Sequence, residues 1–264
     1  MKHVLTIAGS DSCGCAGIQA DLKTMTALGV FGMSAITAIT VQNTREVRAV
    51  HELPPEIVTG QIDAVFDDIA VDAVKVGMVA NAAVARAIRE ALDRRRPANV
   101  VVDPVMVSKS GCRLLSDGAV QEIMRLVASA SLVTPNMPEA ELMSGMKIRD
   151  RADMPAAARA IRAKGAVNVL VKGGRLTDSA DDLLLLDDRE IWLNCPRIPT
   201  RNVNGTGCTL SSAIACGLAK GHSVEEAVRE GKRYVTEGIR FSLDIGQGPG
   251  PLGHFAAARE ISAL

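Results

Sequence analysis

Hydrophobic residues fall in short runs that alternate with longer amphipathic stretches along most of the chain. The runs are apolar at consecutive positions, which is typical of parallel strands covered on both faces. Strands are predicted over His3–Ala8, Ser34–Val41, Ala73–Val76, Asn99–Val102, Ser131–Thr134 and Val167–Val171. Between two of them, Asn81–Arg96 carries Val84, Ile88 and Leu92 on one helical stripe. The alternation of strand and helix predicts an open, mostly parallel α/β sheet.

Prolines and the later part of the chain complete this pattern. Pro54-Pro55 and Asp153-Met-Pro155 each place a proline where the first turn of a helix tolerates it. The last third is predicted to add an edge hairpin and two helices: Asp182–Leu186 with Glu190–Leu193, then Gly207–Lys220 and Ser223–Ser242. Because no linker, low-complexity tract or repeat interrupts it, the chain 1–264 is predicted to form a single domain.

Composition narrows the classes of partner. The 30 Lys and Arg residues balance 30 Asp and Glu residues, and aromatic residues make up 2%. A nucleic-acid binder usually has a basic excess and aromatic stacking surfaces, so we expect no nucleic-acid partner. The uncharged stretch Thr24–Thr44 contains Gly29, Gly32 and several threonines. We interpret it as a helix end, a stop at Leu28-Gly29 and a buried strand, and we expect no membrane partner.

Cysteine and histidine spacing gives no metal motif and no disulfide framework. The six cysteines lack C-x-x-C spacing, and the four histidines are far apart in sequence. The apolar run at the N-terminus is too short for a signal peptide. We therefore expect reduced thiols in a cytoplasmic protein, at Cys13, Cys15, Cys112, Cys195, Cys208 and Cys216.

Polar residues follow the end of each of the six predicted strands. In an open α/β sheet, ligands bind beyond the carboxyl ends of the strands. The clusters are Gly9-Ser10-Asp11, Gln42-Asn43, Gly77-Met78, Asp103, Asn136 with Glu139, and Lys172-Gly173-Gly174. A polar loop is ordinary on its own, but six of them at corresponding ends predict a shared ligand site.

A glycine-rich turn leads into a predicted helix at Asn204–Ile214. Exposed N–H groups and the helix dipole attract anions, so Gly205, Thr206 and Gly207 are predicted to form a phosphate-binding anion hole. The alternative is an ordinary turn in which Thr206 caps the helix. Cys208 stands at the helix N-terminus, where the pKa of a thiol is expected to be lowered. It is either a base or nucleophile, or a small buried filler.

Acidic and amide side chains add to the candidate site. Asp21 lies within the apolar stripe of the first helix and needs either a ligand or a salt bridge to a Lys or Arg. Gln42 closes a strand and is suited to pair with the edge of a heterocycle. Asp103 and Glu139, with Asn136, offer oxygen ligands for Mg²⁺, directly or through water. Otherwise Asn136 is a helix cap. The P-loop and G-x-G-x-x-G motifs are absent, so phosphate is not bound by those routes.

The opening loop resembles a known family. Gly9-Ser-Asp-Ser-Cys-Gly-Cys-Ala-Gly-Ile-Gln-Ala-Asp-Leu-Lys-Thr24 is similar to the signature of bacterial hydroxymethylpyrimidine/phosphomethylpyrimidine kinases of thiamine biosynthesis. The resemblance runs from about residue 3 to about residue 245 and implies a ribokinase-like fold. That fold is a three-layer α/β sandwich whose central, mostly parallel sheet is flanked by helices on both faces. Further matches are Thr37–Thr44, Lys75–Met78, Asp103–Met106, Thr134–Glu141, Val171–Gly174 and Gly205–Cys208.

The resemblance also implies an activity. ATP would phosphorylate the hydroxymethyl group of 4-amino-5-hydroxymethyl-2-methylpyrimidine, and then the monophosphate to the diphosphate. Mg²⁺ would assist, and the enzyme would be a homodimer. Cys208 would be the catalytic base and Lys172 would meet the phosphates. The residues expected to contact the pyrimidine are Asp21, Gln42, Met78 and Val105.

Two departures from the family pattern bear on substrate preference and on the second phosphorylation. Cys15 replaces the second glycine of a usual Gly-Gly-Ala-Gly, so its side chain is expected to narrow the substrate pocket or restrict loop closure. Asn204 replaces a usual histidine but tolerates turn geometry. The alternatives are a pyridoxal kinase of the same superfamily and a non-catalytic pyrimidine-binding protein.

Overall fold

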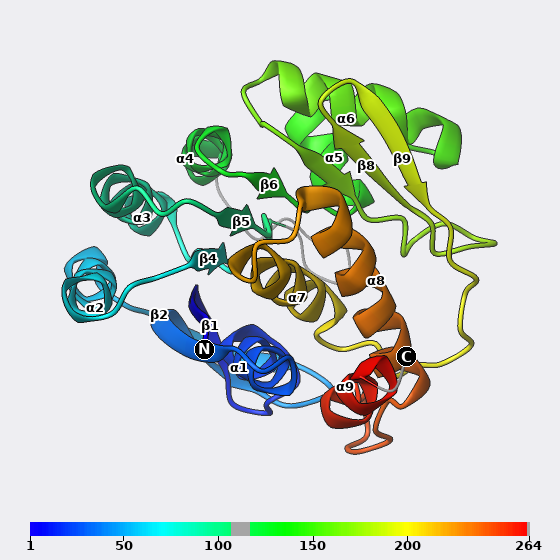
Figure 1. The fold of residues 1–264 in the computed structure, drawn as a ribbon, viewed down its shortest axis with the longest axis horizontal. Helices are drawn as coiled ribbons and strands as arrows, with labels where there is room; N and C mark the ends of the chain where they lie inside the picture. Colours follow the sequence, from blue (N-terminus) through cyan, green and yellow to red (C-terminus); the bar gives the residue numbers. More distant parts are fainter. Residues whose placement is uncertain (107–116, 263–264) are drawn as a thin grey trace.

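A nine-stranded sheet runs through the part of the chain that the computed structural model describes, residues 1–106 and 117–262 (Figure 1). Its order is β3-β2-β1-β4-β5-β6-β7-β8-β9. From β2 to β7 in this order neighbouring strands are parallel, whereas β3, β8 and β9 join antiparallel. The strands are β1 (His3–Asp11), β2 (Phe31–Gln42), β3 (Val47–Glu52), β4 (Ala73–Val76), β5 (Val100–Val102), β6 (Leu132–Val133), β7 (Val169–Val171), β8 (Asp182–Leu186) and β9 (Arg189–Leu193).

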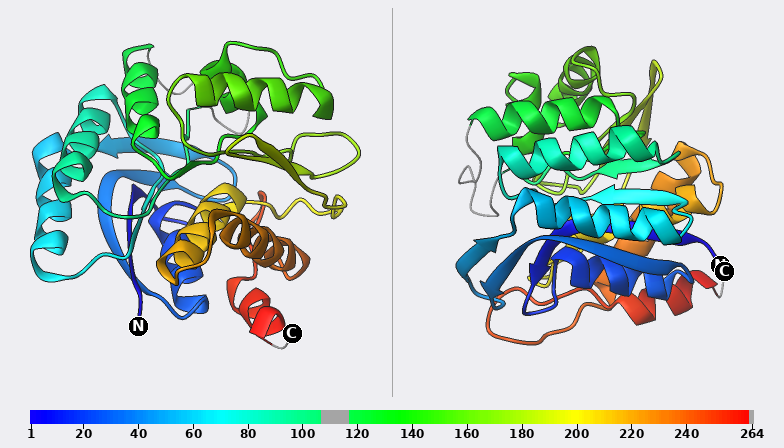
Figure 2. Two further views of the ribbon diagram at one scale, coloured as in Figure 1. Left: turned by 45° about the horizontal axis from the view of Figure 1, so that its top comes forward. Right: turned by 90° about the vertical axis from the view of Figure 1, so that its left-hand side faces the viewer.

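Helices cover both faces of the sheet (Figures 1 and 2). In β4, Val74 and Val76 belong to a core that includes Ile88 of α3, whereas Ala73 belongs to a second core with Ile214 of α7. Helices α2 to α6 contribute to the first core, and α1, α7 and α8 to the second. These three layers confirm the predicted α/β sandwich. The helices are α1 (Gly17–Ala27), α2 (Pro55–Asp68), α3 (Ala82–Arg95), α4 (Asp117–Ala128), α5 (Met137–Ser144), α6 (Met154–Ala163), α7 (Thr206–Ala219), α8 (Val224–Arg240) and α9 (His254–Ser262), with a 3₁₀ turn at Arg151–Asp153.

Most predicted elements are present, with ends that differ by a few residues. The strands at Ala73–Val76 and Asp182–Leu186 occupy the predicted residues, and the edge hairpin is confirmed. Helix α1 stops at Leu28, and Gly29 follows with φ +70°. Helices α4 and α9 were not predicted. No helix within the described ranges is long and apolar enough to cross a membrane.

The edge strand β3 was not predicted, and its pairing with β2 also corrects the prediction made for β2. The segment Val47–Glu52 is exposed throughout and mixes apolar with charged residues, so it lacks the signal of a buried strand. It pairs with the second half of β2, where Ile39 and Val41 are 45% and 54% exposed. The prediction of a wholly buried strand over Ser34–Val41 is therefore wrong for Ile39 and Val41, whereas Thr40 between them is buried at 6% exposure.

Candidate active site

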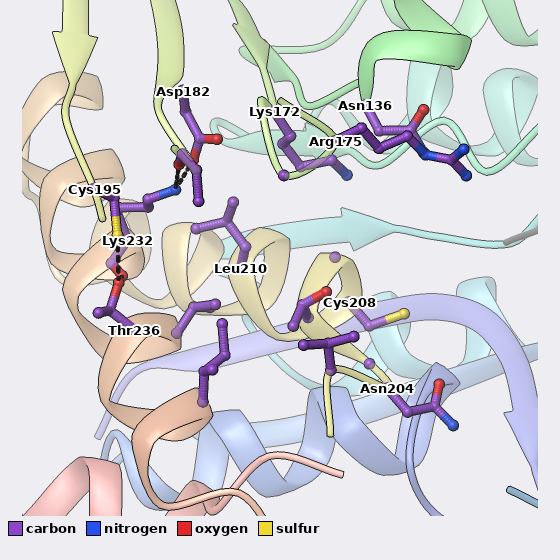
Figure 3. Close-up of a pocket in the computed structure, with 18 of the residues that line it drawn as sticks. Asn136, Lys172, Arg175, Asp182, Cys195, Asn204, Cys208, Leu210, Lys232 and Thr236 are labelled. Atoms are coloured by element: carbon purple, nitrogen blue, oxygen red, sulfur yellow. Dashed lines mark hydrogen bonds and ion pairs between the residues drawn. The ribbon is translucent and has the colours of Figure 1, made fainter. Parts of the chain in front are cut away.

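A cavity of 570 Å³ lies beyond the carboxyl ends of β5 and β7, against α7, α8 and the chain that links β9 to α7 (Figure 3). Figure 3 shows Lys172, Arg175 and Asn136 on one side of it and Cys208 and Asn204 on the other. The structure thus brings together, around one cavity, many of the positions that the sequence singled out. Among them are Asp103, Val105, Asn136, Glu139, Lys172, Asn204, Gly205, Thr206, Gly207 and Cys208.

Lys172 and two buried carboxyl groups form the charged centre of the cavity. Lys172 Nζ donates to Asp103 Oδ1 at 2.6 Å, and Thr134 Oγ1 donates to the same oxygen at 3.1 Å. Burial raises the pKa of Glu139 to about 7; the Asp103 charge adds to this rise and Lys172 opposes it. Burial would lower the pKa of Lys172, but Asp103 and Glu139 outweigh it and raise that pKa. Lys172 is therefore a fixed cation.

The same carboxyl pair suits a divalent cation. Asp103 and Glu139 are buried and repel each other, and a cation between them would relieve that repulsion. Mg²⁺ takes oxygen ligands, commonly one or two carboxylates together with substrate phosphates. Asn136 serves instead as the cap of α5: its Oδ1 accepts from Glu139 N at 3.0 Å, and Glu139 Oε2 accepts from Asn136 N at 2.8 Å. The capping alternative for Asn136 is thus confirmed.

The turn before α7 has the geometry of an anion hole. Gly205 is the N-cap with φ +85°, and no side chain caps the helix, so the alternative of a Thr206 cap is wrong. A Cβ atom at Gly205 would lie 1.9 Å from the Cys15 carbonyl oxygen, so only glycine fits there. A Cβ atom at Gly207 would lie 3.4 Å from both Lys172 Nζ and Asp103 Oδ2. The bare first turn of α7 therefore faces the charged centre, and its N–H groups favour an anion there.

The partly exposed Cys208 thiol does not have the lowered pKa predicted from its position. Burial raises its pKa, the Asp21 and Asp103 charges add to that rise, and the nearby Lys75 charge and a hydrogen bond from Gly17 N oppose it. The balance lies above the ordinary thiol value. The prediction considered only the helix N-terminus, whereas burial of the sulfur has the largest effect on its pKa.

Asp21 is fully buried beneath this site rather than exposed in it. Its carboxylate accepts from Lys75 Nζ at 2.9 and 2.8 Å, from Thr6 Oγ1 at 2.6 Å and from Ser212 Oγ at 2.7 Å. The salt-bridge alternative for Asp21 is confirmed. This cluster joins α1, β1, β4 and α7, and it lies close enough to Cys208 for Lys75 to act on the thiol. Lys75 was missed as a functional candidate, although a lysine inside a buried strand is itself a signal.

Gln42 and Met78 lie at strand ends outside the lining of the cavity. They end β2 and follow β4, the two neighbours of β1 in the sheet. Thr37 Oγ1 donates to the Met78 carbonyl at 2.7 Å, and Thr40 Oγ1 donates to Gln42 Oε1 at 3.1 Å. The Met78 side chain comes within 3.2 Å of where a Cβ atom on Gly9 would be. Because β5 follows β4 in the sheet, these residues continue the row of strand ends that includes Val105.

The far end of the cavity was not predicted. Apolar side chains line it from the β9–α7 connection, α7 and α8: Val203, Leu210, Val235 and Ile239. Lys232 Nζ donates to Asp182 Oδ2 at 2.7 Å at this end (Figure 3). Individually these residues look like ordinary core positions of amphipathic helices, so only the tertiary fold reveals them.

The two departures in sequence have different placements. The Cys15 side chain is 1% exposed and its Sγ donates to the Cys13 carbonyl at 3.7 Å. It does not line this cavity. The expectation that it narrows the substrate pocket or restricts loop closure stays a prediction. Asn204 does line the cavity, and its N–H donates to the Gly250 carbonyl at 3.1 Å. Cys112 lies outside the described residues.

Comparison with known proteins identifies the relatives of this chain. The sequence profile described as phosphomethylpyrimidine kinase matches residues 11–253. A hydroxymethylpyrimidine/phosphomethylpyrimidine kinase of Rhizobium meliloti is 53% identical over 256 residues, which cover 95% of this chain and 96% of that protein. The thiamine biosynthesis bifunctional protein ThiED of Geobacter sulfurreducens is 49% identical over 261 residues, 98% of this chain; the chain spans 53% of that protein's length. The crystal structure of an ADP complex of Bacillus subtilis pyridoxal kinase is 37% identical, with TM-score 0.91 and coverage of 97% and 98%.

Proposed function

Because the chain belongs to the phosphomethylpyrimidine kinase family and is a phosphotransferase, we propose that its cavity carries ATP-dependent phosphorylation of a hydroxymethylpyrimidine. The acceptor is the hydroxymethyl group of 4-amino-5-hydroxymethyl-2-methylpyrimidine, and then the phosphate of the resulting monophosphate. The observation that carries this assignment is the convergence of Lys172, Asp103 and the uncapped first turn of α7 on one cavity. Phosphoryl transfer needs positioning and charge stabilisation at such a point more than covalent chemistry.

ATP is proposed to fill the cavity from its apolar end to its charged centre. The apolar side chains Leu210, Val235 and Ile239 suit the faces of an adenine ring. Lys172 and the N–H groups of Gly205 to Cys208 then lie where the phosphates would end. The ADP complex of the pyridoxal kinase relative supports a nucleotide in this fold.

The charged centre would stabilise the phosphoryl group in flight. Lys172 donates to the transferring oxygens, and the first turn of α7 holds the anion from the opposite side. Asp103 and Glu139 would hold Mg²⁺, which neutralises phosphate charge when bound. Cys208, in its thiolate form, takes the proton of the attacking hydroxyl.

The pyrimidine is proposed to bind along the strand ends beside Cys208. Gln42 offers an amide that pairs with a heterocycle edge, and Met78 and Val105 offer apolar contacts. The fully buried Asp21 acts through Lys75, which sets the charge beneath Cys208, rather than through contact with the ring. Asp21 is in this proposal a positioning residue.

Phosphorus NMR of the protein with ATP, Mg²⁺ and the hydroxymethylpyrimidine tests the assignment. We expect a monophosphate that is followed by a diphosphate, and Lys172→Met is expected to suppress both. Monophosphate alone would confine the enzyme to the first step and direct attention to Asn204. Saturable pyrimidine binding without any product would instead support the non-catalytic binding protein.

Pyridoxal kinase activity is the second candidate, because the Bacillus subtilis pyridoxal kinase is so similar in fold. The two activities share the phosphate-binding residues and differ in the acceptor. Turnover on pyridoxal and on the hydroxymethylpyrimidine, measured side by side, separates them by the ratio of kcat/KM. A ratio in favour of pyridoxal would replace the first assignment.

We further propose that the protein is a cytoplasmic homodimer formed by a single domain. Apolar side chains are exposed on β2 and β3, which supports an interface there: Phe31, Ile39, Val41, Val47 and Val50. Five free cysteines in the described chain suit a reducing compartment. Light scattering should give twice the chain mass, and Val41→Asp should shift it toward the monomer.

A further inference from the structure

The turn after β1 gathers two thiols and a carboxylate. A carboxylate oxygen of Asp11 and the Sγ atoms of Cys13 and Cys15 all lie within 4.8 Å of one another. Asp11 and Cys15 are buried, and Cys13 is partly exposed, so the cluster opens to solvent on one side. Gly14, with φ +76°, reverses the chain between the two cysteines, which lets both face Asp11.

The Asp11 carboxylate is held in place by backbone N–H groups. Its Oδ1 accepts from Cys13 N at 2.9 Å, and its Oδ2 accepts from Cys15 N at 3.1 Å and from Ala16 N at 2.8 Å. The Cys13 thiol also donates to Oδ2, at 3.3 Å. Lys23 lies beside this turn and donates to the Gly14 carbonyl at 2.7 Å. The backbone therefore holds the three ligand groups close together before any cation binds. The Cys13 thiol donates its proton to the Asp11 carboxylate, and a bound cation would replace that proton.

We propose that Asp11, Cys13 and Cys15 form a binding site for a thiophilic divalent cation of the Zn²⁺ class. Two thiolates and one carboxylate are a ligand set that such cations accept, with a fourth position left for water. On binding, two metal–sulfur bonds form and the two thiol protons leave to solvent, with no change in oxidation state. The site is chemically distinct from Asp103 and Glu139, whose oxygen-only ligands suit Mg²⁺.

The site adjoins the active-site cavity without being part of it. The carbonyl of Cys15 lies against Gly205, the N-cap of α7, and Ala16 lines the cavity. Neither sulfur does. Metal binding can therefore be measured on its own, whether or not the proposed kinase activity is present.

Cadmium titration of the reduced full-length protein tests the proposal, because Cd²⁺ bound to thiolates absorbs in the ultraviolet. We expect one Cd²⁺ to bind at this site and Zn²⁺ to displace it. Cys13→Ser keeps a hydrogen-bond donor to Asp11, and Cys15→Gly restores the residue usual in the family, so both variants should fold. Each should lose at least about 100-fold in affinity, since loss of an outer-shell partner alone costs about 10- to 100-fold.

Cys195→Ser and Cys216→Ser are the matched controls, because both remove a buried free thiol from elsewhere in the fold. They should leave the Cd²⁺ affinity and stoichiometry of this site unchanged. The proposal is overturned if the natural protein shows no thiolate absorption with Cd²⁺. It is equally overturned if folded Cys13→Ser and Cys15→Gly, checked by circular dichroism, bind Cd²⁺ as the natural protein does.

Discussion

Burial and the nearby Lys75 charge act in opposite directions on the pKa of the Cys208 thiol, at the start of α7. The thiol faces the cavity beside Gly207, and the buried Lys75 charge partly offsets the burial that keeps it protonated. We expect Cys208→Ala to lower kcat by about 10²- to 10⁴-fold, the usual contribution of a positioned base, while ATP affinity is unchanged. Single-turnover rates and calorimetric ATP binding measure the two separately. Cys216→Ala, on the buried side of the same helix, is the control; full activity of Cys208→Ala would disprove the base role.

The raised pKa of Cys208 also sets an expected pH dependence. The thiolate is the reactive form, and a pKa above the ordinary thiol value leaves only a small thiolate fraction at neutral pH. The rate of the chemical step should therefore rise about tenfold for each pH unit below that pKa. A kcat profile from pH 7 to 10 measures this slope, which Cys208→Ala should abolish. A flat profile in the natural protein would show that proton removal by the thiol does not limit the rate.

Residue-level prediction from sequence succeeded where one residue type in one pattern was informative. A carboxylate in an apolar stripe predicted a partner for Asp21, and the salt bridge to Lys75 confirms it. The glycine-rich turn predicted the start of a helix, which is present, whereas anion binding there stays a prediction. The partner, Lys75, lies 54 positions away, so no local pattern pairs it with Asp21, although a lysine inside a buried strand is itself a signal. The pKa of Cys208 depends on burial and on charges from three other elements, so it could not be predicted from position on the helix alone.

Lys75 of β4 is fully buried and forms an ion pair with Asp21 of α1. The hydrogen bonds from Thr6 and Ser212 to the same carboxylate add β1 and α7, so the cluster joins four elements. Lys75→Met would leave a buried carboxylate without its cation, which typically destabilises a protein by about 3–5 kcal/mol. Urea unfolding followed by circular dichroism measures the loss. Lys2→Met is the matched control, because it breaks an exposed pair with Asp72 at 2.8 Å that should contribute less than about 1 kcal/mol. Equal losses in the two variants would contradict the structural role of the buried pair.

The start of α7 depends on one glycine. Alanine at position 205 would have to adopt φ +85° and would meet the Cys15 carbonyl, so Gly205→Ala should lose at least about 1–2 kcal/mol of stability and most activity. Gly60→Ala is the control, because Gly60 is exposed within α2 with no atom within 4 Å of the added Cβ. That substitution should stabilise the protein by about 0.5–1 kcal/mol. Thermal unfolding and turnover on both variants check the contrast; an active, stable Gly205→Ala would show that the turn can relax.

At the scale of elements, burial decided what the sequence could predict. Central strands such as β4 are buried at every position and apolar at all but Lys75, and they were found. The exposed strand β3 offers no such run, and its pairing with β2 is a tertiary fact. The order of the sheet was also hidden, because β1 pairs with β4 across two intervening strands of sequence.

The C-terminal helix α9 packs against α1 and α8, and so joins the two ends of the chain (Figure 2). Thr24 of α1 and Tyr234 of α8 each lie within hydrogen-bond reach of His254 Nδ1, at 3.3 and 3.4 Å. Among the described residues, the buried Nε2 atom of His254 has no partner. Contacts between positions 24 and 254 could not be predicted from local patterns, which is why α9 was missed.

Burial of His254 between these helices makes the stability of the protein dependent on pH. Burial, with a smaller effect of Lys23, lowers the pKa of His254 from 6.5 to about 4, so the folded protein binds this proton less readily than the unfolded chain. Above pH 6.5 the free energy of unfolding is unaffected by this histidine. As the pH falls from 6.5 toward 4, the unfolded chain takes up the proton first, and the free energy of unfolding decreases by up to about 3 kcal/mol. Urea unfolding at pH 7.5, 6, 5 and 4 measures the slope. His254→Gln should flatten this slope and His51→Gln, at an exposed position, should leave it unchanged; an unaltered slope in His254→Gln would assign the acid sensitivity to other groups.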